Sequence, residues 1–307
     1  MSSVNLQEIR ANIKRRKLIN TIFALVGILV IMVAILTLLG LTIQMVIEGS
    51  SRLNPDFFTS FPSRRAERAG ILSAWVGTSL VMLVTALTAV PLGVAAGIYL
   101  EEYSRKDWLA DLIEINVTNL AGVPSIIYGL LALGLFVYKL QLGQSVISAG
   151  LTLALLILPV IIVTTREALR AIPNSLREAA YALGASKWQM IWDHILPYSF
   201  GSILTGVIIG LSRAIGQTAP LVTIGALTFI AFLPDSPIKS EFPYISFDWL
   251  QAPFTVLPIQ MFNWVSRPER EFEMNAAAAG SVLIAMTLTM NALAIYIRYQ
   301  LRKDVKW

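Results

Sequence analysis

The sequence predicts an all-α membrane protein with six transmembrane helices, and three observations support this fold class. The residues A, V, I, L, M, F, W, Y and C make up 56% of the 307-residue chain, and charged residues only 14%. The mean hydropathy is +0.68, outside the range of ordinary soluble domains. Apolar runs of the length that a helix needs to cross a membrane, roughly 20 residues, recur along the chain. Lys and Arg residues gather in alternate segments between these runs.

Six runs are long enough to cross a hydrocarbon core as helices. They are Leu18–Ile47, Ala69–Leu100, Ile115–Tyr138, Leu140–Thr165, Tyr198–Pro234 and Met274–Ile297. The first run follows the basic segment "RANIKRRK". It exceeds the roughly 7–15 apolar residues of a signal peptide, and no A-x-A cleavage site follows it. We therefore interpret it as a retained signal anchor.

The fifth run needs a break, because a single helix from Tyr198 to Pro234 would measure about 55 Å. Gly216 and Pro220 are the predicted break points, since proline removes a backbone donor and clashes with the preceding turn. Two arrangements fit this length: one crossing followed by a re-entrant or interfacial segment, or two crossings.

Positive charge favours six crossings with both termini in the cytoplasm. With the N-terminus inside, 15 of the 24 Lys and Arg residues lie on the cytoplasmic side and 8 on the outer side. A seventh crossing would place the basic C-terminal segment outside, against the positive-inside rule. Residues Asp235–Glu273 are expected to form an ordered outer loop with a short interfacial helix. The aromatic side chains expected at headgroup level are Trp249, Trp264, Phe242 and Phe254.

A polar stretch, "SLREAAYALGASKWQMIWDHILP", separates the fourth and fifth runs. Ser175 with Glu178 fits a capping box, Ser186 with Gln189 fits a second, and Gly184 suits the left-handed residue that ends a helix. Two short helices are therefore predicted, meeting at Gly184. Their apolar faces consist of Leu176, Ala179, Ala180 and Leu183, and of Trp188, Ile191, Trp192 and Ile195. Helices this short need packing partners, so the stretch is either a docking element or a structural elbow in which Glu178 only caps.

Within this stretch, "EAAYALG" followed by "ILP" resembles the EAA loop of ABC importer permeases. The resemblance implies a type I importer permease fold. It also implies that the loop is a coupling helix that seats in a groove of the ATP-hydrolysing subunit. The residues that match the motif are Glu178, Ala179, Ala180, Gly184, Leu196 and Pro197.

Three further stretches are similar to the permease subunits of phosphate-specific importers of the PstA type, from about Ala69 onward. They are "GVPSIIYGLLALGLF", "SRAIGQTAPL" and the segment Phe262–Arg298. The resemblance implies phosphate as the substrate, a second homologous permease, two ATP-binding subunits and a periplasmic or tethered phosphate-binding protein. It also implies two regions: residues 1–68, with the tail, first crossing and outer loop, and the core permease domain 69–307, with its EAA loop at 173–197.

Two residues depart from the pattern of such permeases. Gln217 stands where they usually carry glutamate in Gly-Glu-Thr-Ala-Pro, and His194 occupies a spacer position that is commonly apolar.

Arg213 is the only charge inside a predicted crossing, and a cation in lipid is costly unless it faces a cavity or a partner. Its guanidinium could form a bidentate fork with an oxyanion, pair with a carboxylate of a sister subunit, or snorkel to the interface. Gln217 and Thr218 adjoin the predicted break, where they could line a passage or only stabilise the break. Glu101 and Glu102 are expected to be solvated or to meet a partner. The outer Arg64, Arg65 and Arg68 could attract anions or anchor in headgroups.

The residue inventory argues against an enzyme. The chain has no cysteine and one histidine, His194, so disulfide frameworks and multi-histidine metal sites are excluded. No predicted crossing carries paired carboxylates or a nucleophile with a base. We therefore predict a permease in membrane lipid, without catalytic residues, metal, cofactor or nucleic-acid partner. The alternatives are a permease for molybdate or sulfate, or an ATP-independent channel or scaffold.

Overall fold

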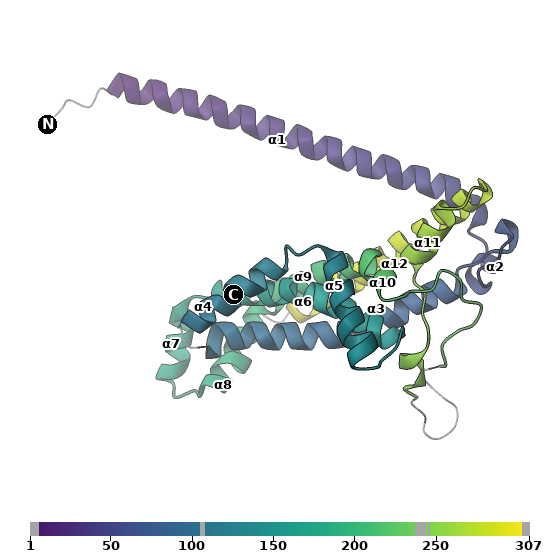
Figure 1. The fold of residues 1–307 in the computed structure, drawn as a ribbon. Coiled ribbons are helices and arrows are strands. Elements are labelled where there is room, and N and C mark those ends of the chain that lie inside the picture. Colours follow the sequence, from purple (N-terminus) through teal and green to yellow (C-terminus); the bar gives the residue numbers. More distant parts are fainter. Residues whose placement is uncertain (1–5, 105–107, 237–243, 245, 303–307) are drawn as a thin grey trace.

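The computed structural model describes residues 6–104, 108–236, 244 and 246–302 (Figure 1). Within these residues every regular element is helical. The described residues contain five helical segments that are long and apolar enough to cross a membrane. Their principal helices are α1 (Leu6–Gly49), α3 (Leu72–Ile98), α6 (Val146–Arg170), α9 (Leu196–Ile215) and α12 (Glu271–Arg302). The all-α prediction is confirmed for the described chain.

The third predicted crossing is not a straight helix. It consists of α4 (Trp108–Leu120) and a second helix, Ser125–Lys139, that starts as α5 (Ser125–Ala132) and ends as a π-helical segment. The two helices are bent by 106° relative to each other. Pro124 precedes α5 and has no backbone N–H, and proline also disfavours helical geometry in the residue before it. Counted as one broken span, the pair brings the number of crossings to six.

The fourth crossing is shifted along the sequence relative to the prediction. Helix α6 begins at Val146 rather than Leu140, because Gln141 and Gly143 have positive φ angles. The Ser145 hydroxyl then caps the helix by accepting the Ser148 amide. At its other end α6 continues to Arg170, five residues beyond the predicted end at Thr165.

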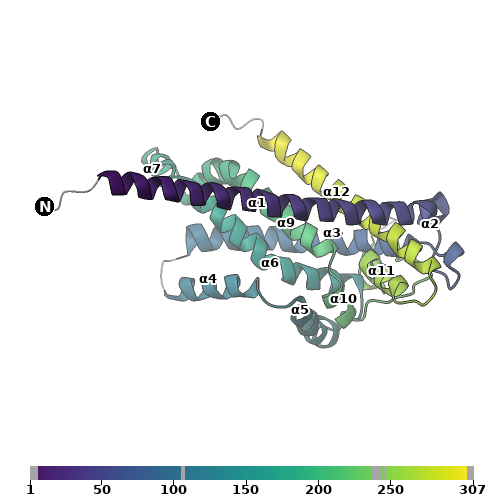
Figure 2. The same ribbon diagram turned by 90° about the horizontal axis from the view of Figure 1, so that it is seen from above.

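The core lies where α3, α6 and α9 pack together (Figure 2). Helix α6 is central: 67% of its most apolar 18-residue window is buried. Small residues let the backbones approach closely, as is usual between membrane helices. A Cβ added at Gly93 would lie 2.7 Å from the Ile161 side chain, and one at Gly97 would lie 2.6 Å from Thr165.

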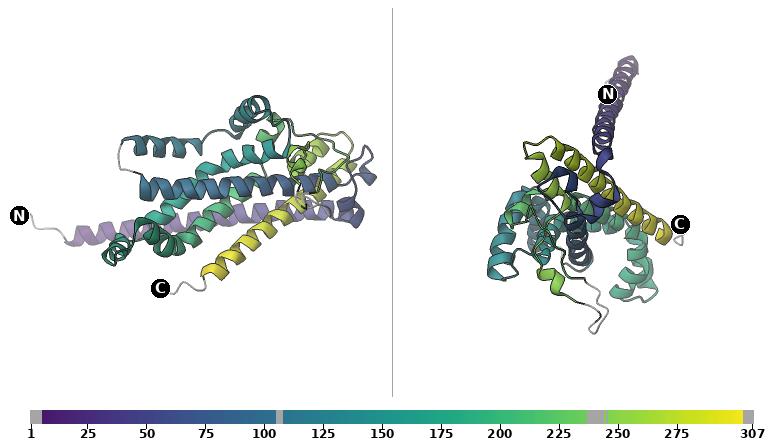
Figure 3. Two further views of the ribbon diagram at one scale, coloured as in Figure 1. Left: turned by 90° about the horizontal axis from the view of Figure 1, so that it is seen from below. Right: turned by 90° about the vertical axis from the view of Figure 1, so that its right-hand side faces the viewer.

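Helix α1 stands apart from this bundle (Figure 3). Its 44 residues measure about 66 Å, and its most apolar window has no buried residue. It is held at its end, where a Cβ on Gly49 would lie 2.5 Å from the Ala278 nitrogen of α12. Arg52 follows in the 3₁₀ turn Ser50–Arg52 and donates to Asn275 Oδ1 at 2.6 Å and to the Ala66 carbonyl at 2.9 Å.

The outer-loop aromatic residues lie in the protein rather than at headgroup level. Trp249, Phe254 and Trp264 are 7%, 1% and 0% exposed, so the headgroup prediction is wrong for them, and Phe242 lies outside the described residues. The elements here are α2 (Pro55–Thr59), 3₁₀ turns at Ala66–Arg68 and Asp248–Gln251, and α11 (Leu257–Val265). Helix α11 packs against α12 and α3 and buries Trp264, whereas Trp249 and Phe254 belong to the main core cluster with α3, α6 and α9.

The fifth run breaks where predicted. Helix α9 ends at Ile215, Gly216 follows, and the five-residue helix α10 (Ala219–Thr223) contacts α5. Residues 224–234 are not helical. Of the two arrangements considered, the structure has one crossing followed by a short helix. In Figure 2, α5 and α10 lie partway along the bundle, short of the end that carries α2 and α11.

The polar stretch between α6 and α9 folds as two helices, and we call residues 174–195 the elbow. The first is α7 (Asn174–Ala182), and Gly184 has φ +84°, as predicted. Ser186 and Gln189 form the predicted capping box before α8 (Lys187–Gln189). The predicted box at Ser175 is wrong, because Pro173 occupies the N-cap of α7 and no side chain caps it.

The second helix of the elbow is also longer than predicted. Helix α8 runs through the π-helical segment Met190–Ile195 into α9, so Lys187–Ile215 is one membrane-span candidate. Pro197 lies in the first turn of α9, where proline is tolerated, and does not separate the elbow from the crossing. Both described chain ends lie toward the elbow end of the bundle (Figure 2).

Replacing Gly49 by alanine is expected to weaken the attachment of α1, because the added Cβ meets backbone atoms of α12 that cannot rotate away. Overpacking of this kind costs about 1–3 kcal/mol. Gly27→Ala in the same helix is the matched control, since nothing lies within 4 Å of its Cβ. The midpoint of thermal unfolding in detergent should fall only for Gly49→Ala. Equal midpoints would contradict the close contact with α12.

Ser186→Ala should loosen the start of the second elbow helix by about 1 kcal/mol, the usual cost of losing a cap. Ser175→Ala is the matched control, because no side chain caps α7. Amide hydrogen exchange over residues 186–195 should become faster in Ser186→Ala and stay unchanged in Ser175→Ala. Similar exchange in the two variants would show that the capping box does not hold this helix.

Candidate functional site

The residues of the two apolar faces predicted for the elbow are partly buried against the bundle and partly exposed. Ala180, Ile191 and Ile195 are 4%, 2% and 0% exposed and form a small core with the end of α6. The opposite side exposes a group of large apolar side chains, which we call the elbow patch. It consists of Tyr181, Leu183, Trp188 and Trp192.

The elbow patch is held in a defined shape. Leu183 is 87% exposed, next to the left-handed Gly184. The rings of Trp188 and Trp192 stack with centroids 5.4 Å apart, one helical turn from each other. An exposed apolar patch on a capped, ordered segment is typical of a protein interaction surface.

The residues of the EAA motif do not all lie on the exposed side. Glu178, Ala179, Gly184 and Pro197 are exposed, Leu196 is half-buried, and Ala180 lies in the small core. No side chain caps α7, so Glu178 does not have the capping role that a purely structural elbow would give it. The motif therefore supplies both an exposed surface and the contact that seats it on the bundle.

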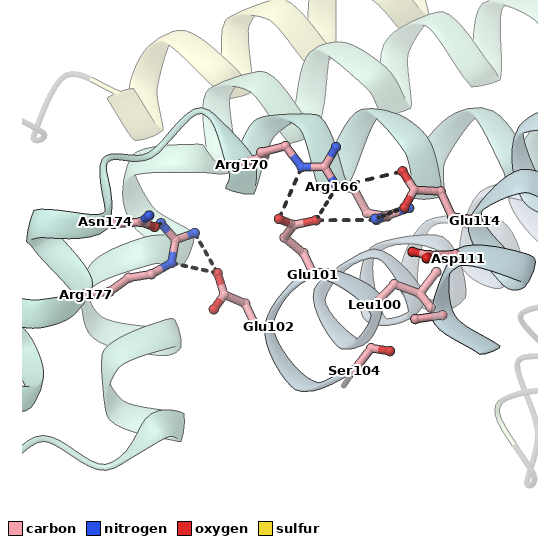
Figure 4. Close-up of a pocket in the computed structure, with 11 residues that line it drawn as sticks. Leu100, Glu101, Glu102, Ser104, Asp111, Glu114, Arg166, Arg170, Asn174 and Arg177 are labelled. Carbon is pink, nitrogen blue, oxygen red and sulfur yellow. Dashed lines mark hydrogen bonds and ion pairs between the residues drawn. The ribbon is translucent and has the colours of Figure 1, made fainter. Parts of the chain in front are cut away.

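A group of ion pairs joins the elbow to the bundle (Figure 4). Arg177 of α7 donates to Glu102 at 2.7 Å, and to the carbonyls of Ile172 and Leu169 at 2.7 and 2.9 Å. The side chains of Arg177 and Glu102 are only 16% and 7% exposed. The expectation that Glu102 is solvated is wrong. The sequence could not predict this ion pair, because Arg177 and Glu102 lie 75 positions apart and no local pattern connects them.

The neighbouring carboxylates complete this network. Glu101 pairs with Arg170 at 3.1 Å and Arg166 at 3.5 Å, and Arg166 also donates to Glu114 of α4 at 2.8 Å. These groups line a pocket of about 550 Å³. The lining residues are Leu100, Glu101, Glu102, Ser104, Ala110, Asp111, Glu114, Arg166, Arg170, Asn174 and Arg177. Because each guanidinium in this pocket is already paired with a carboxylate, the network is a structural joint rather than an open anion site.

The predicted path residues lie at the break between α9 and α10. Arg213 is exposed in the last turn of α9, where a cation interacts favourably with the helix dipole. Within the described chain it forms no ion pair, and it lies near enough to Tyr128 of α5 to interact with it electrostatically. Gln217 and Thr218 are half-buried in the turn between the two helices. Arg213, unpaired among the described residues, is thus followed within five positions by an amide and a hydroxyl at a helix break.

Among the described residues there is no group of three or more His, Asp or Glu side chains that could hold a metal ion. His194 is half-buried in the π-helical segment of the elbow. The arrangement instead consists of an exposed apolar patch, an ionic joint and a polar helix break.

Comparisons with known proteins show the family to which the chain belongs. Residues 89–307 match the family model described as binding-protein-dependent transport system inner membrane component. The chain is 34% identical over 266 residues to the phosphate transport system permease protein PstA of Yersinia pestis, covering 84% of this chain and 82% of that protein. It is 32% identical over 284 residues to PstA of Haemophilus influenzae, covering 92% and 94%.

A solved structure shares the fold. It is that of a bacterial ABC transporter involved in the import of the polysaccharide alginate, with a TM-score of 0.60 and 14% identity over 97% of this chain and all of that one. The chain belongs to the family of binding-protein-dependent transport system inner membrane components.

Proposed function

We propose that the chain is the permease subunit of an ATP-driven importer of inorganic phosphate. The observation that carries this proposal is the 34% identity to a phosphate transport system permease over 84% of the chain. The chain would form half of the translocation path, beside a second homologous permease. Two ATP-binding subunits would drive it, and a periplasmic or tethered phosphate-binding protein would deliver the substrate. It would have no catalytic residues of its own.

The elbow patch is the proposed contact with the ATP-binding subunits. Leu183, Trp188 and Trp192 are exposed, and Gly184 and the Ser186 capping box hold them in place. Glu178 and Ala179 lie on the exposed side of the same elbow. The first described residues of α1 and the last of α12 lie toward this end of the bundle, so we propose that the elbow and both termini are cytoplasmic. The division into residues 1–68 and 69–307 stays a prediction.

The break after α9 is the proposed substrate passage. An arginine within a membrane protein normally faces a cavity or a partner, and Arg213 is exposed without an ion pair in the described chain. Its planar guanidinium suits the paired oxygens of an oxyanion. Gln217 and Thr218 would add neutral hydrogen-bonding groups beside it. Because residue 217 is glutamine, the passage has no carboxylate at this position to neutralise Arg213.

The direct test of the proposed function is reconstitution of the chain with its co-purifying subunits in proteoliposomes. Phosphate uptake should require ATP and the binding protein, and excess molybdate or sulfate should not compete with it. Uptake of molybdate or sulfate in place of phosphate would favour the other oxyanion permease. ATP-independent flux would favour a channel.

Leu183→Glu should reduce co-purification of the ATP-binding subunits by at least about tenfold, because an apolar anchor in an interface is worth about 2 kcal/mol. Leu183 is 87% exposed, so the change should leave the permease folded. Tyr299→Glu, at a 65% exposed position near the end of α12, is the matched control. Quantitative pull-down of the complex measures the effect. Unchanged recovery with Leu183→Glu would contradict docking on the elbow patch.

Arg213→Gln should lower phosphate uptake at least about tenfold while the complex still assembles, because a hydrogen bond to a charged group contributes about 1.5–3 kcal/mol. The uptake rate of Arg213→Lys should lie between those of the wild type and Arg213→Gln, since lysine keeps the positive charge and loses the bidentate geometry of the guanidinium. The control is Lys139→Gln, an exposed charge at the end of the helix that begins with α5. Initial uptake rates at several phosphate concentrations measure the effect. Wild-type rates in Arg213→Gln would exclude this residue from the passage.

A further inference from the structure

We propose that the π-helical turn Tyr99–Tyr103, which continues α3 at its elbow end, is the receiving turn that carries movement of the elbow into the membrane core. The inference rests on the proposed function, since it assumes that ATP-binding subunits move the elbow. It assigns positioning roles to two contacting pairs, Arg177 with Glu102 and Lys187 with Tyr103. The support is that this short turn contacts both helices of the elbow and the end of α6.

The first contact joins the receiving turn to the first elbow helix. Arg177 donates twice to one carboxylate oxygen of Glu102, at 2.7 and 3.1 Å. The same guanidinium also binds two carbonyls at the end of α6, those of Leu169 and Ile172. Arg177 therefore fixes α7 at three points, and the low exposure of both charged side chains excludes the water that would screen them. In Figure 4 the two side chains point toward each other across the gap between α7 and the receiving turn.

The second contact joins the receiving turn to the second elbow helix. The Lys187 ammonium lies 4.9 Å from the ring centroid of Tyr103, which is cation–π distance. Tyr103 in turn stacks on Tyr99, with ring planes 9° apart. Lys187 is the first residue of α8, directly after the N-cap residue Ser186. The two contacts thus lie on opposite sides of Gly184, one on each elbow helix.

The third contact joins the receiving turn to the helices of the bundle. Glu101, adjacent to Glu102, forms ion pairs with Arg166 and Arg170 of α6. Arg166 also forms an ion pair with Glu114 of α4. One carboxylate of the turn therefore faces the elbow while its neighbour faces the bundle. A wide π-helical turn often marks a functional site in a helix. Because the side chains of Arg177, Glu102, Glu101 and Arg166 are ion-paired and largely buried, a displaced elbow has to displace the receiving turn or break the ion pairs.

The test is a charge exchange in the full complex: Arg177→Glu, Glu102→Arg, and both together. The readouts are complex assembly, ATP hydrolysis and phosphate uptake in proteoliposomes. In each single variant two like charges face each other. Phosphate uptake per ATP hydrolysed should therefore fall about fivefold or more in an assembled complex, because coupling between two sites is usually of this size. The double exchange should restore at least part of this ratio. The control is Lys14→Glu, a charge reversal at an exposed position of α1, which should leave phosphate uptake per ATP hydrolysed unchanged.

A second pair of variants keeps the test decisive where charge reversal prevents assembly. Glu102→Gln and Tyr103→Leu remove the two attractions without adding like charges, and each should lower the uptake per ATP with the complex intact. The proposed role of the receiving turn would be overturned by a wild-type ratio of phosphate uptake to ATP hydrolysis in both variants. It would also be overturned if the double exchange lost as much of this ratio as its single variants. If the wild-type complex takes up no phosphate with ATP, the proposed function fails, and this inference fails with it.

Discussion

The close packing of α3 against α6 is the constraint on which the rest of the structure depends. Membrane helices gain little from the hydrophobic effect among themselves, because lipid is as apolar as their side chains. Close van der Waals contact must replace it, and glycine is what permits that contact here. Gly93 and Gly97 of α3 face Ile161 and Thr165 of α6, while Gly150 of α6 faces Val84 of α3. The contact therefore extends along most of both helices and fixes how they are aligned.

That alignment decides what happens at the elbow end. With Gly97 fixed beside Thr165, the turn after α3 lies beside the last turn of α6, so Glu101 reaches Arg166 and Arg170. The elbow then meets a surface that already carries a carboxylate and the carbonyls at the end of α6, and Arg177 binds both. A shift of one helical turn, about 5.4 Å, would separate these partners. The core packing and the ionic joint are thus one arrangement, in which apolar contacts set the positions and charges connect them.

The sequence predicts the features that depend on local chemistry. Run length gives the crossings, Gly216 marks the end of α9, and Gly184 and Ser186 specify the turn and cap of the elbow. These features follow from hydrophobicity, missing side chains and hydrogen bonds between residues three apart. Ser175 shows the limit of such patterns, because its capping spacing is satisfied while Pro173 takes the position. A motif identifies a residue that can cap, whereas the neighbouring backbone decides whether it does.

Other features depend on residues far apart in sequence and leave no local pattern. The pairing of Arg177 with Glu102 spans 75 positions, and the burial of Trp264 depends on how α11 packs against α12 and α3. Both cases involve side chains that hydropathy alone assigns to water or headgroups. For the site, composition identifies Arg213 as an unusual charge, but only the fold places it beside α5 at a helix break.

The distribution of satisfied and unsatisfied groups separates the parts of the chain that hold it together from the parts that act. The three arginines of the ionic joint are paired, so their cost of burial is offset within the chain. Arg213 and the elbow patch are different, since Arg213 has no ion pair with any described residue and the patch leaves apolar surface exposed. Both arrangements are unfavourable for an isolated chain. Trp188 and Trp192 of the patch lie at one end of the continuous helix Lys187–Ile215 and Arg213 at the other, so this helix connects the surface proposed to receive ATP-driven movement with the passage proposed to respond to it.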